Sequence, residues 1–225
     1  LFRSHQNMIR IWGGGYYEEE DFYDLCDELG LCVWQDFMFA CSAYPTFEPG
    51  FIDNVRGEVE DNVRRLRHHA SLALWCGNNE LEQGVRRSDS TWPGMPPEEY
   101  AKLFDELIPA VLAELDPERD YWPSSPHTPG ELRDDHSNQN IGDAHLWAVW
   151  HGRQPFEWYR TSHSRFCSEF GFQSFPEPRT CYAFADPGER NVSGYVMDLH
   201  QRSGIGNTVI MQYMMSWFPL PTGFE

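Results

Sequence analysis

Short apolar runs alternate with longer helix-like segments along most of this chain of 225 residues. The runs have the length of buried strands and lie at 8–12, 31–35, 71–75, 120–122, 145–150 and 165–168. Apolar residues at helical spacing and helix start and stop signals predict helices at 18–29, 51–69 and 98–115. Strands that alternate with helices predict an α/β fold, a parallel sheet covered by helices.

Two glutamates follow directly after apolar runs. Glu80 ends the segment Trp-Cys-Gly-Asn-Asn-Glu at 75–80, and Glu169 lies within Arg-Phe-Cys-Ser-Glu-Phe-Gly at 165–171. Barrel enzymes keep their chemistry at the carboxyl ends of parallel strands. Hydrolysis of a glycosidic bond needs two carboxyl groups in one pocket, because one must donate a proton while the other is ionised. The two glutamates together therefore predict a glycosidase site, whereas either one alone could equally be an ordinary solvated acid.

Five motifs carry a resemblance to a known family. They are Asn-Met-Ile-Arg-Ile-Trp-Gly-Gly-Gly at 7–15, Val-Trp-Gln-Asp-Phe-Met-Phe-Ala-Cys at 33–41, the 75–80 segment, Trp-His-Gly at 150–152 and Ser-Glu-Phe-Gly-Phe-Gln-Ser at 168–174. In this order they resemble the catalytic domain of β-mannosidases of glycoside hydrolase family 2. The resemblance covers residues 1 to about 221.

The resemblance implies a partial (β/α)8 TIM barrel. A complete barrel takes about 250 residues, and the six predicted strands match strands two to seven, without the first and the last. We therefore expect residues 1–225 to form one incomplete catalytic domain, a fragment without the flanking β-sandwich domains of the family. In this arrangement 176–188 is a loop, and 201–217 falls in the last connection between strand and helix.

The activity implied by the resemblance is that of a retaining exo-β-mannosidase that removes terminal β-D-mannose. Glu169 matches the nucleophile and Glu80 the general acid/base, while Asn79 matches an asparagine that bonds the sugar 2-hydroxyl. Two alternatives stay open. One is another family 2 glycosidase, an exo-β-glucosaminidase, β-galactosidase or β-glucuronidase, and the other is a carbohydrate-binding fragment without catalysis.

Aromatic residues make up 15% of the chain, and several lie near the predicted strand ends. Such rings can form flat apolar walls against the C–H faces of a sugar, or they can pack in the core. Because they match family motifs, we predict Trp12 and Trp150 for the substrate pocket.

Three polar residues are further substrate-binding candidates, and two of them have an ordinary structural alternative. Asp36 follows the second strand and could bond a sugar hydroxyl or form a salt bridge with Arg10. His145 could orient the nucleophile or the substrate. His151 in Trp-His-Gly could bond a hydroxyl or cap a strand turn.

The net charge of −18 leaves no basic stripe for phosphates, so we expect no nucleic-acid partner. No segment has the roughly 20 apolar residues of a membrane helix, and we expect no membrane partner. The predicted partner is a β-mannoside or a mannose-containing oligosaccharide. The expected location is the cytoplasm for a bacterial source, with a lysosomal or secreted protein also open.

No cofactor or metal is implied by the sequence. The six cysteines lack the dense spacing of a disulfide scaffold, and we expect reduced thiols. The adjacent pair His68 and His69 lies beside a predicted strand, and we interpret it as a helix end rather than a zinc ligand pair.

Overall fold

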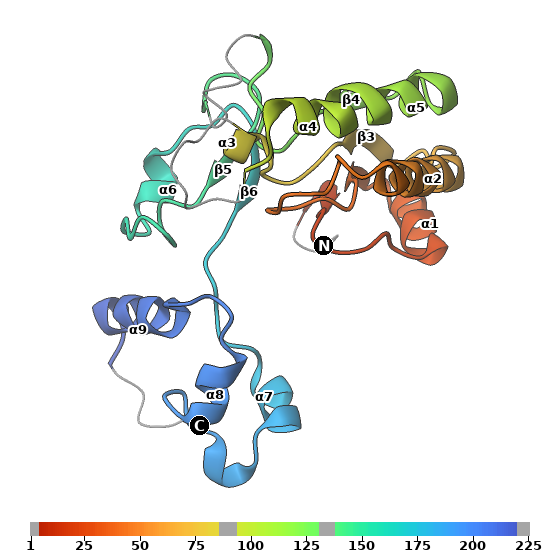
Figure 1. Ribbon diagram of the computed structural model, residues 1–225. Helices are drawn as coiled ribbons and strands as arrows, with labels where there is room; N and C mark the ends of the chain where they lie inside the picture. The colour runs from red at the N-terminus through yellow and green to blue at the C-terminus, as the bar shows by residue number, and fades with distance from the viewer. Residues whose placement is uncertain (1–4, 86–93, 131–137, 220–225) are drawn as a thin grey trace. The chain divides into compact units, whose positions relative to one another are not determined.

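The structure is a computed structural model that describes residues 5–85, 94–130 and 138–219 (Figure 1). The chain divides into two compact units. The first comprises Leu1–His145 and His163–Glu169, and the second comprises Leu146–Ser162 and Phe170–Glu225. The expectation that the whole chain is one incomplete catalytic domain stays a prediction.

A four-stranded parallel sheet forms the centre of the first unit. Its strands are β1 (Met8–Ile11), β2 (Cys32–Asp36), β3 (Leu72–Cys76) and β4 (Asp120–Trp122), adjacent in that order. In register, Ile9 pairs with Val33 and Leu74 with Asp120. Strands β5 (Ala144–Leu146) and β6 (Cys167–Phe170) form a separate two-stranded sheet. The predicted mixed α/β fold with a parallel sheet is confirmed.

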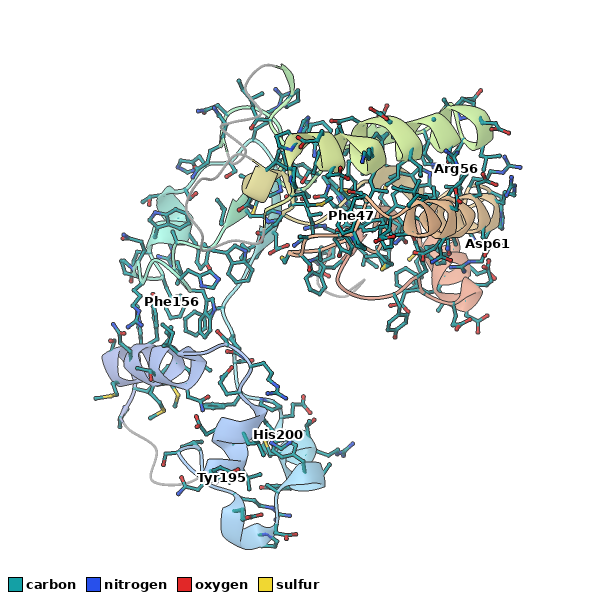
Figure 2. All side chains as sticks on the ribbon, viewed as in Figure 1. Phe47, Arg56, Asp61, Phe156, Tyr195 and His200 are labelled. Atoms are coloured by element: carbon teal, nitrogen blue, oxygen red, sulfur yellow. The ribbon has the colours of Figure 1, made fainter. Side chains whose placement is uncertain are left out.

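The helices of the first unit gather beside the four-stranded sheet (Figure 1). Helix α1 (Glu20–Leu29) begins with two acidic residues, which suit the positive end of the helix dipole, and it ends at Gly30 with φ 67°. Helix α2 (Pro49–Leu66) has proline in its first turn. Its valines 55, 59 and 63 are buried, whereas Arg56 and Asp61, labelled in Figure 2, lie on its exposed side.

The predicted helix at 98–115 is present in three continuous parts. These are α4 (Pro97–Ala101), the π-helical segment η2 (Lys102–Leu107) and α5 (Ile108–Leu115). Pro109 has no N–H to donate to the carbonyl of Asp105, and just before it the N–H of Ile108 bonds to Leu103, five residues earlier. The proline thus explains the wider turn, and α5 still packs against α2.

The two faces of the sheet have different surroundings. Along β2, Val33 belongs to the apolar core and Gln35 accepts a hydrogen bond of 2.6 Å from Tyr23 of α1. The core also holds Trp75 of β3, stacked on Phe37 with ring centroids 5.1 Å apart. On the opposite face Trp34 lines a cavity of about 600 Å³.

The second unit is mostly helical within the described residues. Its helices are α6 (Trp158–Thr161), α7 (Pro178–Phe184), η4 (Pro187–Glu189), α8 (Tyr195–His200) and α9 (Gly206–Trp217). Val209 and Ile210 of α9 pack with Val149 and Trp150, and the hydroxyl of Tyr213 donates to the carbonyl of Val149 at 2.8 Å. The short helix α3 (Glu82–Val85) belongs to the first unit.

Two details of the sequence interpretation are wrong. The strand predicted at 145–150 ends at Leu146, because the chain turns at Trp147 and the N–H of His151 bonds back to its carbonyl at 2.8 Å. The loop predicted at 176–188 contains α7, which begins at Pro178, a residue suited to the first helical position. No helix in the described ranges is long and apolar enough to cross a membrane.

The packing of α2 leads to a stability prediction. Leu66 is fully buried, so Leu66→Ala is expected to lower the free energy of unfolding by about 2–5 kcal/mol. Leu25→Ala on α1, where the side chain is 54% exposed, should change it by about 0.5 kcal/mol or less. Urea unfolding followed by circular dichroism measures both, and equal losses would contradict this packing of α2.

Candidate active site

A polar cluster in the first unit draws side chains from all six strands or the segments that follow them. It comprises Arg10, Asp36, Asn79, Glu80, Ser125, Asp143, His145, Ser168 and Glu169. These residues stand at positions far apart in the sequence. Their convergence follows from parallel strands, whose carboxyl ends meet at one edge of a sheet.

Arg10 of β1 lies at the centre of this cluster. Its guanidinium donates to Asp36 at 2.7 and 3.2 Å, to Glu169 at 3.0 Å and to Asn79 at 2.9 Å. Burial by itself would lower the pKa of Arg10, but the charges of Asp36 and Glu169 raise it. The guanidinium therefore stays charged and holds the side chains of β2, β6 and the loop after β3 together.

Asp36 is fully buried and accepts four hydrogen bonds. Besides the two from Arg10, the N–H of Gly13 donates at 3.0 Å and the indole N–H of Trp34 at 2.9 Å. The salt bridge with Arg10, one of the two alternatives for this residue, is therefore present. A direct bond from Asp36 to a sugar hydroxyl does not fit a side chain with no exposed surface.

The loop after β3 holds Glu80 by several backbone and side-chain contacts. At Gly77 a Cβ atom would lie 2.2 Å from the carbonyl oxygen of Pro123, so only glycine fits this close approach. The side-chain NH2 of Asn78 donates to the same carbonyl at 3.0 Å. The side-chain oxygen of Asn78 accepts from the N–H of Leu81. Glu80 itself has φ 62°, a left-handed conformation that costs a non-glycine residue about 1–2 kcal/mol.

His145 of β5 bonds directly to Glu80. Its Nδ1 lies 2.6 Å from Oε1 of Glu80 and 3.7 Å from Oε2 of Glu169. Burial tends to raise the pKa of Glu80, but the hydrogen bond and the charge of His145 outweigh it, so the net pKa is lowered. Each of Glu80 and Glu169 has a carboxylate oxygen within 4.8 Å of the other.

A second set of hydrogen bonds holds the Nε2 side of the His145 ring, away from the Nδ1 that faces Glu80. Ser125 places its hydroxyl 2.9 Å from Nε2 of His145 and 2.7 Å from Asp143, and the hydroxyl of Ser168 donates to Asp143 as well. The other carboxylate oxygen of Asp143 accepts from the indole of Trp122 at 2.8 Å. These buried contacts fix the imidazole ring that faces Glu80.

Cys41 lies on the other side of Glu80. Its thiol is 3.7 Å from Oε2 of Glu80 and accepts from the amide of Asn79 at 3.3 Å. Burial and the negative charge of Glu80 raise the pKa of Cys41 to about 11. The group is thus a neutral thiol that donates to the carboxylate.

Glu80, His145 and Glu169 offer ligand atoms close enough for a metal ion to bridge. However, the Arg10 guanidinium is bonded to Glu169 and lies 3.4 Å from Nε2 of His145. This fixed positive charge would repel a cation at the same place. The cluster therefore fits proton transfer between Glu80 and His145 better than metal binding.

The remaining predicted site residues have varied surroundings. Trp12, in the first unit, is 46% exposed. Trp150 and His151 lie in the second unit, where Trp150 is buried against Phe172 at a centroid distance of 5.1 Å and His151 is exposed. Their roles toward a substrate stay predictions.

Sequence reasoning did not select Ser125 and Asp143 of the cluster, nor Cys41 beside Glu80. Asp143 lies just before β5, which begins at Ala144, so strand periodicity does not mark it. Ser125 follows β4 by three residues in a loop, and no pattern in the sequence marks it.

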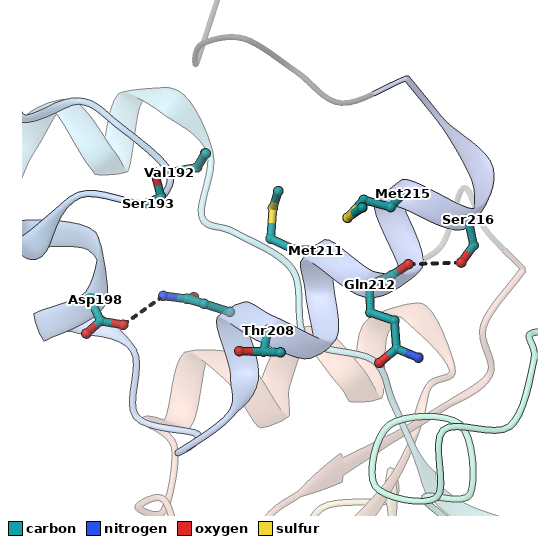
Figure 3. Close-up of a pocket in the computed structure, with 9 residues that line it drawn as sticks. Val192, Ser193, Asp198, Thr208, Met211, Gln212, Met215 and Ser216 are labelled. Carbon is teal, nitrogen blue, oxygen red and sulfur yellow. Dashed lines mark hydrogen bonds between the residues drawn. The ribbon is translucent and has the colours of Figure 1, made fainter.

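A different cavity, of about 780 Å³, lies in the second unit (Figure 3). It is lined by side chains of α8, α9 and the segment before α8, among them Asp198, Met211 and Met215. Asp198 accepts a bond of 3.3 Å from Asn207 and contributes the only acidic group of the lining residues. A site for acid/base chemistry by two carboxyl groups is not present in this lining.

Comparison with known proteins gives relatives for the whole chain, although no model of a protein family matches it. The chain is 38% identical over 236 residues to β-mannosidase B of Neosartorya fischeri and 37% identical over 233 residues to that of Emericella nidulans. These alignments cover 100% and 99% of the chain but only 28% and 27% of the relatives.

Solved structures agree with these relatives. The β-D-mannosidase of Dictyoglomus thermophilum superposes with a TM-score of 0.85 and 40% identity, covering 96% of this chain and 26% of that protein. A β-glucuronidase of Bacteroides uniformis shares the fold over 75% of the chain, with a TM-score of 0.53, 24% identity and 20% of its own length covered.

The chain is thus related to glycoside hydrolases. Among them it is similar over its whole length to β-mannosidases, which confirms the resemblance that its five motifs predicted. The chain spans about 28% of the length of the curated relatives it matches.

The Glu80–His145 bond can be tested directly. In His145→Ala the donor is lost while burial of the carboxyl group remains, so the pKa of Glu80 is expected to rise. Carbon-13 NMR titration of the glutamate carboxyl groups measures it, with the exposed His163→Ala as control. Because the folded pKa of Glu80 is lowered, its ionised form stabilises the fold above the ordinary glutamate pKa.

That stabilisation is lost as the pH falls through the lowered pKa, and His145→Ala should remove it. An unchanged Glu80 titration in His145→Ala would show that the imidazole does not govern this carboxyl group.

Proposed function

We propose that this chain carries the catalytic centre of a retaining exo-β-mannosidase, with Glu169 as nucleophile and Glu80 as general acid/base. One observation above all supports the proposal. The two carboxylates approach within 4.8 Å in one cluster and are held by different partners, Arg10 and His145. Retaining glycosidases keep their carboxyl groups about 5–5.5 Å apart, whereas inverting enzymes leave about 6.5–9.5 Å for a water molecule.

The architecture that we propose around this centre is a partial TIM barrel of family 2 over residues 1–225, containing strands two to seven. The parallel order of β1 to β4 supports it, as does the gathering of the cluster at the strand ends. Similarity to β-mannosidases over the whole chain supports the choice of mannose.

In the first step Glu169 attacks the anomeric carbon as the bond to the leaving oxygen breaks. Arg10, bonded to Oε2 of Glu169 at 3.0 Å, fixes the orientation of this carboxylate. A covalent mannosyl-enzyme results.

The proton for the leaving oxygen comes from the Glu80–His145 pair. The 2.6 Å hydrogen bond between Nδ1 of His145 and Oε1 of Glu80 provides the path along which this proton is passed. Transfer to the leaving oxygen leaves Glu80 ionised. In the second step Glu80 takes a proton from water, which attacks the mannosyl-enzyme and releases β-mannose with retained configuration.

Asn79 and Asp36 have supporting roles in this proposal. The carbonyl oxygen of Asn79 accepts from Arg10, so its amide group is held in a fixed direction for a bond to the sugar 2-hydroxyl. Asp36 acts through Arg10 rather than on the sugar, because it orients the guanidinium that bonds Glu169. Trp12, Trp150 and His151 are proposed as further contacts of the sugar.

The two carboxylates are tested in the complete protein with aryl β-mannosides. Glu169→Gln should lower kcat/KM by at least about 10⁴-fold, since the covalent step is lost. Glu80→Ala should retain attack on a substrate with an acidic phenol as leaving group, because such a leaving group needs no proton, and azide should then restore turnover as β-mannosyl azide. The exposed Glu28→Gln is the control.

Proton NMR of the first product decides the stereochemistry. Initial release of β-mannose is expected, and initial α-mannose would overturn the retaining mechanism. Hydrolysis of aryl β-glucuronide or β-galactoside in preference to β-mannoside would overturn the choice of sugar while leaving the two carboxylates in place.

The proposed bond between Asn79 and the sugar 2-hydroxyl is tested by removing either the side chain of Asn79 or the 2-hydroxyl. Asn79→Ala is expected to lower kcat/KM for an aryl β-mannoside by about 10²-fold or more, because bonds to the 2-hydroxyl strengthen at the transition state. For the matching 2-deoxy sugar the same substitution should cost far less. Equal losses for both sugars would mean that Asn79 acts through Arg10 and not on the 2-hydroxyl.

A further inference from the structure

A second group of ionisable side chains lies at the opposite end of β3 from Glu80. It comprises Glu20, Asp24 and Asp27 of α1 together with His68 and His69, which follow α2 and precede β3. His69 is buried, whereas Glu20 and His68 are accessible from solvent. The proposed glycosidase chemistry uses none of these residues.

The two ring nitrogens of His69 have different carboxylate neighbours. Nδ1 lies 2.8 Å from Oδ2 of Asp27, whose other oxygen accepts from the N–H of Ser71 at 2.6 Å. A histidine that binds a metal almost always donates its other ring N–H to such a partner, which fixes the tautomer. Asp27 is therefore placed to direct the Nε2 lone pair of His69 toward Glu20.

The distance from Nε2 of His69 to Oε2 of Glu20 is 3.3 Å. Two ligands on a tetrahedral zinc ion, with bonds of about 2.0–2.1 Å, are separated by about 3.3–3.4 Å. His68 supplies a third ligand atom, since one atom from each of Glu20, His68 and His69 falls within 4.8 Å of the others. The distance between Nε2 of His69 and Oε2 of Glu20 thus matches the separation of two ligand atoms on one zinc ion. The side chain of His68 is exposed and can rotate to supply the third ligand atom.

The charges around these atoms also suit a divalent cation. Arg65 donates to Oε1 of Glu20 at 2.7 Å, which orients the carboxylate so that Oε2 points toward His69. Asp24, 3.9 Å from Nδ1 of His69, adds negative charge that offsets Arg65.

We propose that Glu20, His68 and His69 bind a zinc-class divalent cation, with Asp27 positioning His69. Two imidazoles and a carboxylate are ligands that zinc accepts, and a water molecule completes the tetrahedron on the solvent side. The bound ion would link the start of α1 to the end of α2. The interpretation of His68 and His69 as a plain helix end is then incomplete. The competing arrangement is a protonated His69 held between Asp27 and Glu20 without metal.

Titration calorimetry on the chelator-treated full chain tests the proposal, with Zn²⁺ as the probe. We expect one Zn²⁺ per chain and a higher Tm in its presence, because a ligand that binds only the folded state stabilises it. Mg²⁺ should have no such effect. His68→Ala and Glu20→Gln should each weaken Zn²⁺ binding by more than about tenfold, and Asp27→Asn by about 10–100-fold at unchanged stoichiometry.

The exposed His163→Ala is the matched control and should bind Zn²⁺ as the unchanged chain does. Because six free cysteines could also take up metal, Co²⁺ spectra accompany the titration. A thiolate-to-cobalt charge-transfer band would assign the binding to cysteine and overturn the proposal. Absence of binding to the unchanged chain, or equal affinity of His68→Ala, would overturn it as well. Circular dichroism checks that each variant remains folded.

Discussion

The buried guanidinium of Arg10 is the interaction on which the active cluster depends. A charge removed from water must be paired and fully hydrogen-bonded, or it destabilises the fold by several kcal/mol. Here Asp36 neutralises it from β2, while Asn79 and Glu169 accept from it at the end of β3 and in β6. One side chain of β1 therefore sets the positions of groups from β2, β6 and the loop after β3, and it does so through directional hydrogen bonds.

The two glutamates have different hydrogen-bond partners, because Arg10 bonds Glu169 and leaves Glu80 to His145. Glu169 takes its bond from a cation that keeps its charge at every physiological pH, whereas Glu80 takes its bond from an imidazole that can gain or lose a proton. Two chemically equal carboxyl groups thus acquire unequal environments. The left-handed backbone at Glu80 fits the same view, since strain of this kind persists where surrounding contacts enforce it, here those of Asn78, Phe39 and Ser125.

The sequence predicted the sheet well because its signals are local. Apolar runs such as 71–75 and the periodic valines of α2 indicate burial directly. Gly30 predicts the end of α1 because glycine readily adopts the left-handed conformation found there. The network behind His145 was not predictable, because Ser125 and Asp143 meet only after β4 and β5 are placed. The error at 145–150 has a related cause: an apolar run rich in tryptophan supports a buried turn as readily as a strand.

Strand β3 connects the two ionisable clusters of the first unit. His69 stands three residues before Leu72, where the strand begins, and Glu80 stands four residues after Cys76, where it ends. In barrel enzymes the carboxyl ends of the strands carry chemistry, and the amino ends serve stability. A cation bound at His69 would fix the entry to β3, while Arg10 and Asn78 fix its exit. A strand held at both ends has little freedom to shift in register, which is what a carboxyl group placed within 2.6 Å of its proton partner requires.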